Sequence, residues 1–508
     1  MKLYSAEQIR AWDEYTIKNE PIASVDLMER AATKCFKWLD SHLSQKSDFE
    51  VFCGMGNNGG DGLVLARLLA QEGKNVTVYV IKTGDKGSPD FETNLKRLKE
   101  TKANLVQVDS DKQLTPIPPY AIIIDALFGT GLKRPLDGLA AKTVEHINSF
   151  VNTKISIDVP SGMPADFVSN YSDYKEVIVS DLTLSFQQPK QSFLFAEMGK
   201  NVGELVVLDI GLSHEYQQQI PSNFYWLQHN DVKSVLKSRN RFSHKGTYGH
   251  ALIIGGSMGK AGAVLLASKS CVKTGAGLTT AFIPRCAYTP IQTFVPEVMT
   301  EAIQKEDLLD FMPHDTKNYT AIGLGMGMGT QITTRDAMDD FMAGVEGEKL
   351  VIDADALNCL SINFTERKKI KLPVNAILTP HPKEFDRMFG ESKSSYERLQ
   401  KQIEAARKHK VYIVLKGTHT SIALPTGEVY FNSTGNAGMA TGGSGDVLTG
   451  IITALRAQGY TQKEACILGV YLHGLAADLA LETQSHQSLA ATDIIKYLGA
   501  GFKKIQTN

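Results

Sequence analysis

The chain has 508 residues, more than one ordinary hydrophobic core supports, so we expect two domains. Hydrophobic residues make up 43% and charged residues 21%, as in soluble globular proteins, and no apolar run approaches the roughly 18 residues of a membrane span. The formal net charge of -1 argues against a nucleic acid or an anionic membrane held by bulk electrostatics, so small-molecule ligands are favoured.

The N-terminal segment mixes charged and apolar residues at helical spacing. It lacks the uninterrupted apolar stretch of a secretory signal, so we expect a cytoplasmic protein. The six cysteines include no CxxC pair, which predicts neither a zinc site nor a disulfide framework. We expect them to be reduced core residues.

Short apolar runs alternate with helical patterns in the first half of the chain. The predicted strands are 49–53, 76–82, 120–128 and 154–160. This alternation is typical of βαβ units around a mostly parallel sheet. A polar stretch at 211–249 interrupts it, and we place the domain boundary near residue 220. The alternation then resumes, without a repeat of the first half, and predicts a second α/β domain with strands at 251–256, 320–325, 349–357, 374–380 and 410–417.

A glycine-rich loop, CGMGNNGGDG, follows the first predicted strand. Gly54, Gly56 and Gly59 match the spacing GxGxxG of a dinucleotide fingerprint, but the next strand ends in lysine instead of the required acid. A tight turn without a ligand is the alternative interpretation. That alternative leaves the polar side chains of Asn57, Asn58 and Asp61 unexplained at an edge where α/β sheets bind ligands.

Two later strand ends also carry aspartate. Asp125 opens DALFGTGLKRP, and Asp158 opens DVPSG. Each alone could be a helix cap, but three polar strand ends in one domain favour a site. Oxygen ligands from Asn58, Asp125 and the region of Ser161 suit a hard cation, while Lys133 and Asp158 could exchange protons with a substrate.

Four loops follow strands in the second half. GGSMGKAG fails the P-loop spacing and GLGMGMG fails GxGxxG, so both are interpreted as turns that a ligand can approach closely. His381 lies between two prolines in TPHPKE and is either a packed residue or a functional one. Lys416 begins KGTHT, which is either a nucleotide-binding edge or a surface turn.

The segment GNAGMATGGSGDVLTG at 435–450 has five glycines among residues 435–445, followed by a helical apolar pattern that begins near Asp446. Free amides at a helix N-terminus attract phosphate oxygens. Asp446 is either a first-turn acid favoured by the helix dipole or a general base. As a base it would take the proton of a hydroxyl that attacks phosphorus, while the amides of 443–445 stabilise the transferred phosphoryl group.

Taken together, these motifs resemble a known family. GNAGMATGGSGDVLTGII, LKGTHT, TPHPKEF, GLGMGMG and GGSMGKAGA resemble the C-terminal carbohydrate-kinase-like domain of bifunctional nicotinamide nucleotide repair enzymes, and CGMGNNGGDG, DALFGTGLKRP and DVPSG resemble their N-terminal epimerase domain. The resemblance implies a Rossmann-like doubly wound sheet over residues 1–220 and a ribokinase-like α/β domain over 221–508. It covers nearly the whole chain in the family's domain order.

The resemblance also implies the reaction. The substrates would be NADH and NADPH that carry water across a nicotinamide double bond. The first domain would interconvert the R and S hydrates. The second would dehydrate the S hydrate with ADP, by phosphorylation and elimination, to give NAD(P)H, AMP and phosphate.

By the same resemblance, most of the site residues can be assigned in this numbering. The first domain would hold the hydrate through Asn57, Asn58, Gly59, Gly60, Asp61, Gly129, Thr130, Gly131, Leu132, Lys133, Arg134, Pro135 and Asp158. A potassium ion would be bound by Asn58, Asp125 and Ser161, with Lys133 and Asp158 as the proton-transfer pair. In the second domain the hydrate would contact Ala263, Gly327, His381 and Asp446, the last as catalytic base. The adenine nucleotide would contact Lys416, Gly417, Thr418, His419, Thr420 and Gly445.

The chain departs from the family pattern in four loops. Met55 and Met326 replace prolines, HPKE stands for HPGE, and GNAG stands for GNPG. Mg²⁺ is expected for phosphoryl transfer in general, not from a visible ligand set. We expect no nucleic-acid or membrane partner, and a homo-oligomer.

Two other functions compete with repair. One is an ATP-dependent small-molecule kinase of the ribokinase-like class with an accessory dinucleotide-binding domain, which would release a stable phosphorylated product. The other is a binding module whose N-terminal domain has lost catalysis. No counted feature of the sequence excludes ATP in favour of ADP.

Overall fold

The computed structural model describes residues 1–43, 47–367 and 372–507, which divide into two compact units. One unit contains residues 2–222 and 394–396, and the other contains residue 1, residues 223–393 and the chain from 397 onward. Among the described residues, no helix combines the length and apolarity that a membrane span requires.

The N-terminal sheet has seven strands in the order β3-β2-β1-β4-β5-β6-β7, all paired in parallel. They are β1 Phe49–Cys53, β2 Val76–Ile81, β3 Asn104–Val108, β4 Ile122–Ala126, β5 Lys154–Ile157, β6 Leu182–Phe186 and β7 Glu204–Leu208. The strand order reverses beside β1, so the predicted Rossmann-like doubly wound fold is confirmed. In such sheets the ligand crevice lies outside the carboxyl ends of the two strands at the reversal, here β1 and β4.

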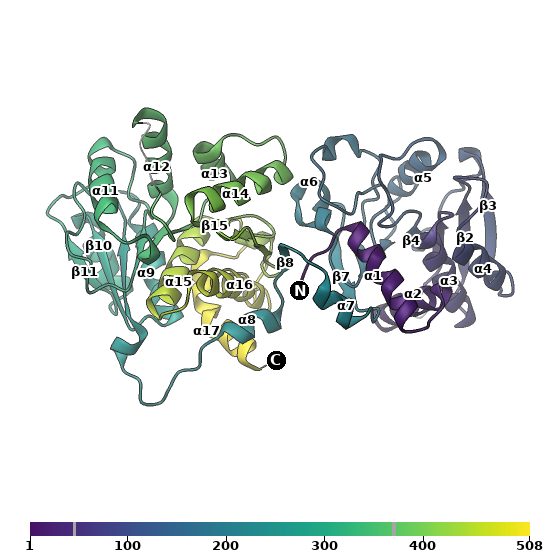
Figure 1. Ribbon diagram of the computed structural model, residues 1–508, viewed down its shortest axis with the longest axis horizontal. Coiled ribbons are helices and arrows are strands. Elements are labelled where there is room, and N and C mark those ends of the chain that lie inside the picture. The colour runs from purple at the N-terminus through teal and green to yellow at the C-terminus, as the bar shows by residue number, and fades with distance from the viewer. Residues whose placement is uncertain (44–46, 368–371, 508) are drawn as a thin grey trace. The chain divides into compact units, whose positions relative to one another are not determined.

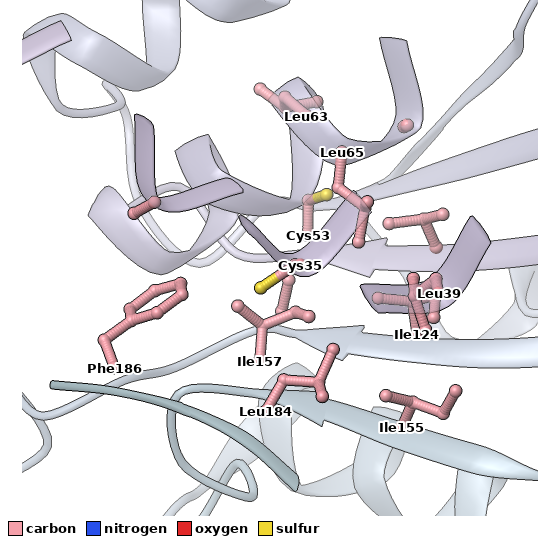
Figure 2. Packing of buried hydrophobic residues seen from close by; sticks show 14 of the residues in the cluster. Cys35, Leu39, Cys53, Leu63, Leu65, Ile124, Ile155, Ile157, Leu184 and Phe186 are labelled. Atoms are coloured by element: carbon pink, nitrogen blue, oxygen red, sulfur yellow. The ribbon is translucent and has the colours of Figure 1, made fainter. Parts of the chain in front are cut away.

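Helices pack on both faces of this sheet because its strand residues alternate between two apolar layers. Val51 and Cys53 lie in one layer with side chains of α1 to α4, and Phe52 lies in the other with side chains of α5. Figure 2 shows the first layer, where Cys35 of α2 lies near Ile157. The helices are α1 Ala6–Asn19, α2 Ser24–His42, α3 Asn57–Gln71, α4 Pro89–Leu98, α5 Gly138–Asn148, α6 Ala196–Gly199 and α7 His214–Gln219. All six cysteines of the chain are free thiols, and five are buried.

The C-terminal sheet has ten strands in the order β11-β10-β9-β12-β13-β14-β15-β16-β17-β8. They are β8 Phe224–Trp226, β9 His250–Ile254, β10 Leu278–Ile283, β11 Met299–Ala302, β12 Ala321–Leu324, β13 Leu350–Ile352, β14 Ile377–Leu378, β15 Tyr412–Leu415, β16 Ser421–Ala423 and β17 Val429–Phe431. Strands β9 to β15 pair in parallel, and β16 is antiparallel to both neighbours. This confirms a second α/β domain, again with a reversal beside its first parallel strand, β9. The run 349–357 is only partly a strand, because α12 begins at Ala354.

The helices of this unit are α8 His229–Val235, α9 Ala261–Thr274, α10 Tyr288–Phe294, α11 Ile332–Gly344, α12 Ala354–Arg367, α13 Pro382–Phe389, α14 Ser395–His409, α15 Ser444–Ala457, α16 Gln462–Ala480 and α17 Ala491–Thr507. Figure 1 shows α15, α16 and α17 grouped together within the unit. Helix α15 also contacts α9 closely at Gly450, where a Cβ atom would lie 2.1 Å from the carbonyl oxygen of Ala267. Only glycine fits there, so the middle of α15 packs directly against the backbone of α9.

Candidate active sites

The loops after β1 and β4 touch through backbone. A Cβ atom on Gly54 would lie 2.0 Å from the Leu127 carbonyl oxygen, and one on Gly59 would lie 1.8 Å from the Gly54 carbonyl oxygen. These two glycines are therefore required by the turn itself. Gly56 has open space around it. The GxGxxG spacing thus reflects a tight β1–α3 turn at two of its three positions.

Asp125 is the buried centre of this crevice. Its Oδ1 accepts hydrogen bonds from Ser161 Oγ at 2.5 Å and Leu127 N at 3.2 Å, and its Oδ2 accepts from Ser161 N at 2.8 Å and Ser156 Oγ at 2.7 Å. Burial raises the pKa of this carboxyl, and the four hydrogen bonds oppose the rise. The structure therefore brings Asp125 and Ser161 together, although they are far apart in the sequence.

Asn58 lies against the loop after β4. A Cβ atom on Gly129 would be 3.2 Å from the Asn58 Cβ, and the buried Asn58 Nδ2 has no hydrogen-bond partner among the described residues. Within the described ranges, no cationic side chain pairs with the completely buried Asp125. The carboxylate of Asp125, the hydroxyl of Ser161 and the side-chain carbonyl of Asn58 are oxygen ligands of the kind that fit a hard cation.

Asp158 follows β5 with a left-handed backbone conformation, φ 67°. Lys190 Nζ lies 2.6 Å from its Oδ1, and Phe186 N donates to the same oxygen at 3.1 Å. The Lys133 side chain is exposed on the loop after β4, and no hydrogen bond or ion pair joins it to Asp158 among the described residues. The ion-pair partner of Asp158 is thus Lys190, which the sequence analysis did not single out.

The other N-terminal candidates divide by exposure. Asn57, Gly131 and Arg134 are exposed, while Asp61, Gly129, Thr130, Leu132 and Pro135 are half-buried. Gly60 faces α2, since a Cβ atom there would lie 2.6 Å from Met28 Sδ. Burial raises the pKa of Asp61 well above its usual value, and Asp158 adds to the rise.

The C-terminal unit contains a cavity of about 750 Å³. Seven of the expected residues line it: His381, Lys416, Gly417, Thr418, Thr420, Gly445 and Asp446. They come from the loops after β14 and β15 and from the first turn of α15. That helix begins at Ser444, so the prediction that the glycine segment leads into a helix N-terminus is confirmed.

Lys416 is held over the first turn of α15. Its Nζ donates to Asp353 Oδ1 at 2.8 Å, and Thr449 Oγ1 donates to Asp353 Oδ2 at 2.6 Å. A Cβ atom on Gly445 would lie 3.2 Å from Lys416 Nζ. Asp353 thereby links Lys416, which follows β15, to Thr449 of α15. The ammonium group lies beside the N-terminus of α15, whose amides can bind phosphate.

Asp446 is half-buried in the cavity wall. Burial raises its pKa from 3.8 to about 7, the Asp353 carboxylate adds to the rise, and Lys416 opposes it. A carboxyl that titrates near neutral pH is suited to general-base catalysis. Asp446 also lies in the first turn of α15. The helix-dipole interpretation and the general-base interpretation are therefore compatible.

His381 is both a helix cap and a cavity residue. Its Nδ1 accepts hydrogen bonds from Lys383 N at 3.1 Å and Glu384 N at 3.3 Å. The Nε2 atom lies 3.4 Å from Glu384 Oε1. Burial, followed by the nearby Lys416, lowers the pKa of His381, so its ring is neutral at pH 7.

Three expected residues lie outside the cavity lining. Gly327, at φ 65°, is next to Ala263, since a Cβ atom there would be 3.1 Å from the Ala263 Cβ. Both lie at the strand-order reversal between β9 and β12. The Nδ1 atom of His419 lies 3.1 Å from Asn432 O, and the His419 ring packs edge-on against the ring of Trp226.

The sequence analysis missed Asp353, Glu384 and His473, which also line the cavity. Asp353 follows β13, and an aspartate at a strand end was the signal that selected Asp125 and Asp158. Burial lowers the pKa of His473 to about 4, and its Nε2 lies 3.3 Å from Ser444 Oγ. Its signal is a lone polar side chain in an apolar helical run.

Comparison with known proteins matches both units. A family model described as NAD(P)H-hydrate dehydratase matches residues 251–499, and one described as YjeF-related protein N-terminus matches residues 24–192. The chain is 34% identical to a bifunctional NAD(P)H-hydrate repair enzyme of Moorella thermoacetica, over 98% of this chain and 96% of that one. It is 30% identical to the enzyme of that name from Escherichia coli, over 98% of this chain and 93% of the relative.

A solved structure is also similar over the C-terminal half. The ADP/ATP-dependent NAD(P)H-hydrate dehydratase of Bacillus subtilis, co-crystallized with ATP and Mg²⁺, is 32% identical, with a TM-score of 0.48, over 55% of this chain and 98% of that one. The two family models and the near full-length identities show that this chain belongs to the family of bifunctional NAD(P)H-hydrate repair enzymes.

Proposed function

We propose that this chain repairs hydrated NADH and NADPH, epimerising the R and S hydrates in its N-terminal unit and dehydrating the S hydrate with ADP in its C-terminal unit. The observation that carries the proposal is the position of Asp446, which lies in one cavity with Lys416 and the N-terminal turn of α15. A base, a cation and free helix amides are what transfer of a phosphoryl group to a hydroxyl requires.

The dehydration takes two steps. Asp446 removes the proton of the added hydroxyl while its oxygen attacks the β-phosphorus of ADP, and the bond to the bridging oxygen breaks to release AMP. The ring nitrogen then expels the new phosphate as the carbon–oxygen bond breaks, and the adjacent carbon loses a proton. The products are the reduced nicotinamide, AMP and inorganic phosphate. Lys416 and the amides of 443–445 hold the phosphoryl oxygens throughout.

The epimerisation uses the crevice of the N-terminal sheet. Asp158 exchanges a proton with the hydrate, which the loops after β1 and β4 hold through Asn57 to Asp61 and Gly129 to Pro135. Lys133 acts as the second proton-transfer group, because its exposed chain can reach a substrate bound outside the sheet edge. Asn58, Asp125 and Ser161 would hold a potassium ion, which would supply positive charge to the site.

The proposed activity also involves a metal ion, further contact residues and an assembly of several copies. Magnesium accompanies the nucleotide, because it neutralises phosphate charge in phosphoryl transfer. Ala263 and Gly327 contact the hydrate, and Thr418, His419 and Thr420 contact the nucleotide. The protein acts as a homo-oligomer in the cytoplasm.

The test uses acid-hydrated NADH as purified mixed epimers, with recovery of absorbance near 340 nm in the presence of ADP or ATP. Wild-type protein should recover all of the absorbance with ADP. Lys133→Ala should recover only the S fraction on the same timescale, and Asp446→Asn should recover none. The loss for an acid or base is roughly 10²–10⁴-fold.

The rival functions predict different results. A kinase would consume ATP and release a stable phosphorylated product without recovery of absorbance. A binding module would leave epimer exchange unaffected by Lys133→Ala. Failure of the wild-type protein to recover absorbance with either nucleotide would contradict the repair function.

A further inference from the structure

A buried lysine, Lys190, forms an ion pair with Asp158. The Lys190 side chain is only 2% exposed, and Asp158 is 12% exposed. Besides Asp158 Oδ1, Lys190 Nζ contacts three oxygens at the end of β6 and just after it: Phe186 O at 2.9 Å, Ser185 Oγ at 3.0 Å and Gln188 O at 3.4 Å. The segment 185–190 thus encloses the ammonium group.

The two carboxylate oxygens of Asp158 differ in their hydrogen-bond partners. Oδ1 receives both Lys190 Nζ and Phe186 N. Oδ2 makes no hydrogen bond among the described residues, and it belongs to a side chain that keeps some exposure at the crevice. One oxygen is therefore fixed by the protein, while the other is available to a substrate.

Stability alone does not account for this arrangement. A buried ion pair often contributes no more to stability than a well-packed apolar pair of the same volume. Asp158 also has a left-handed backbone, at φ 67°, which is uncommon outside glycine, although aspartate adopts it more readily than most residues. Strain and a buried ion pair at a ligand crevice together indicate a functional use.

Three other titratable groups face Asp158 from the helices above the sheet. They are Asp13 of α1, Cys35 of α2 and Asp61 of α3. Burial, and next the charge of Asp158, raises the pKa of Asp13 to about 7, whereas Lys190 opposes the rise. Lys190 is the one cation that the described structure pairs with this group of acids.

We propose that Lys190 is a positioning residue of the epimerase site, which pairs with Asp158 and aims it so that its Oδ2 atom exchanges the substrate proton. The inference rests on the proposed epimerase function and deepens it. Without Lys190, Asp158 would lose its charged partner in a buried site that holds two other carboxyls, and its Oδ1 atom would keep only the contact with Phe186 N. The role differs from the one proposed for Lys133, which is exposed and would transfer a proton itself.

The test compares Lys190→Met with a matched control in the full chain. Lys154→Met removes another buried lysine of the same unit, whose Nζ contacts, among the described residues, only the backbone oxygens of Phe150 and Asn152. The rate of conversion of purified R hydrate to S hydrate is followed by chromatography from pH 5 to pH 9 and corrected for the uncatalysed rate. Thermal denaturation and dehydration of the S hydrate check that each variant is folded.

Lys190→Met should lower kcat about 100-fold with a much smaller change in KM, as expected for loss of an effect on proton transfer. The acidic limb of its pH profile should move to higher pH by about one to three units, as expected when an opposite charge is removed from a carboxylate. Lys190→Arg should restore part of both. Lys154→Met should keep the wild-type profile, even if it lowers stability.

Other results would overturn the inference. An unshifted pH profile for Lys190→Met, or an equal loss in Lys154→Met, would reduce Lys190 to a structural residue while the epimerase function stands. Should Lys190→Met not fold, Lys190→Gln takes its place, and an unshifted profile for folded Lys190→Gln with full activity would overturn the inference equally. A wild-type protein that does not exchange the epimers would contradict the epimerase function itself, and the inference with it.

Discussion

Replacing Gly445 by alanine tests how the nucleotide site is built. The new Cβ atom would lie 3.2 Å from Lys416 Nζ and 3.9 Å from Asp353 Oδ2. The ammonium is itself held 2.8 Å from Asp353 Oδ1, so it can give way only by lengthening that ion pair. We therefore expect the substitution to displace the positive charge that faces the phosphates.

The magnitude follows from two opposing effects. A displaced lysine should weaken ADP binding about tenfold, which is about 1.4 kcal/mol. Alanine in a helix is about 0.5–1 kcal/mol more favourable than glycine, so the stability of the C-terminal unit should not fall. Gly445→Ala should thus reduce affinity without unfolding the site.

The assay is a calorimetric titration with ADP and Mg²⁺, with the thermal midpoint measured in parallel. Gly442→Ala is the control, because it lies in the exposed loop just before α15 and a Cβ atom there would meet nothing within 4 Å. Wild-type affinity in Gly445→Ala would refute the role given to Lys416. An equal loss in both variants would attribute the effect to the loop backbone instead.

Three further predictions concern pH, packing and the cation. Asp446 has its folded-state pKa raised from 3.8 to about 7, so the stability that protonation contributes is complete below about pH 4 and is lost as the pH rises through 7. Asp446→Asn should therefore abolish dehydration yet raise the free energy of unfolding at pH 8, by up to about 4 kcal/mol, in urea denaturation compared with wild type. Wild-type dehydration should gain rate as the pH rises through about 7, and a rate independent of pH from 5 to 8 would exclude Asp446 as the base. Gly450→Ala should lower the unfolding free energy by about 1–3 kcal/mol or more, because its Cβ atom would overlap the Ala267 oxygen of α9 at 2.1 Å, whereas Gly499→Ala, with open space, should not. Exchange of potassium for tetramethylammonium should slow epimerisation reversibly, and Ser161→Ala should raise the potassium concentration that epimerisation needs. An unchanged potassium requirement in Ser161→Ala would show that the cation binds elsewhere.

The sequence alone determined the class of both domains and the position of most motifs. The strands 49–53, 76–82, 120–128 and 154–160 were predictable because apolar β-branched runs between helical patterns are local signals. The glycine segment before Asp446 was predictable for the same reason, since a phosphate-binding turn and the helix that follows it are contiguous. The aspartates at strand ends were predictable because parallel strands bring their carboxyl ends to one edge of a sheet.

Only the tertiary structure decided which side chains meet. Lys190 pairs with Asp158 across 32 positions of sequence, and Lys416 pairs with Asp353 across 63. Such pairs depend on which strands are neighbours in the sheet and on the direction each side chain takes from its strand end. No local pattern encodes either property, because both arise when strands distant in the chain pair and their helices cover them. The sequence therefore located the edges where chemistry occurs, and the fold selected the partners that tune each acid.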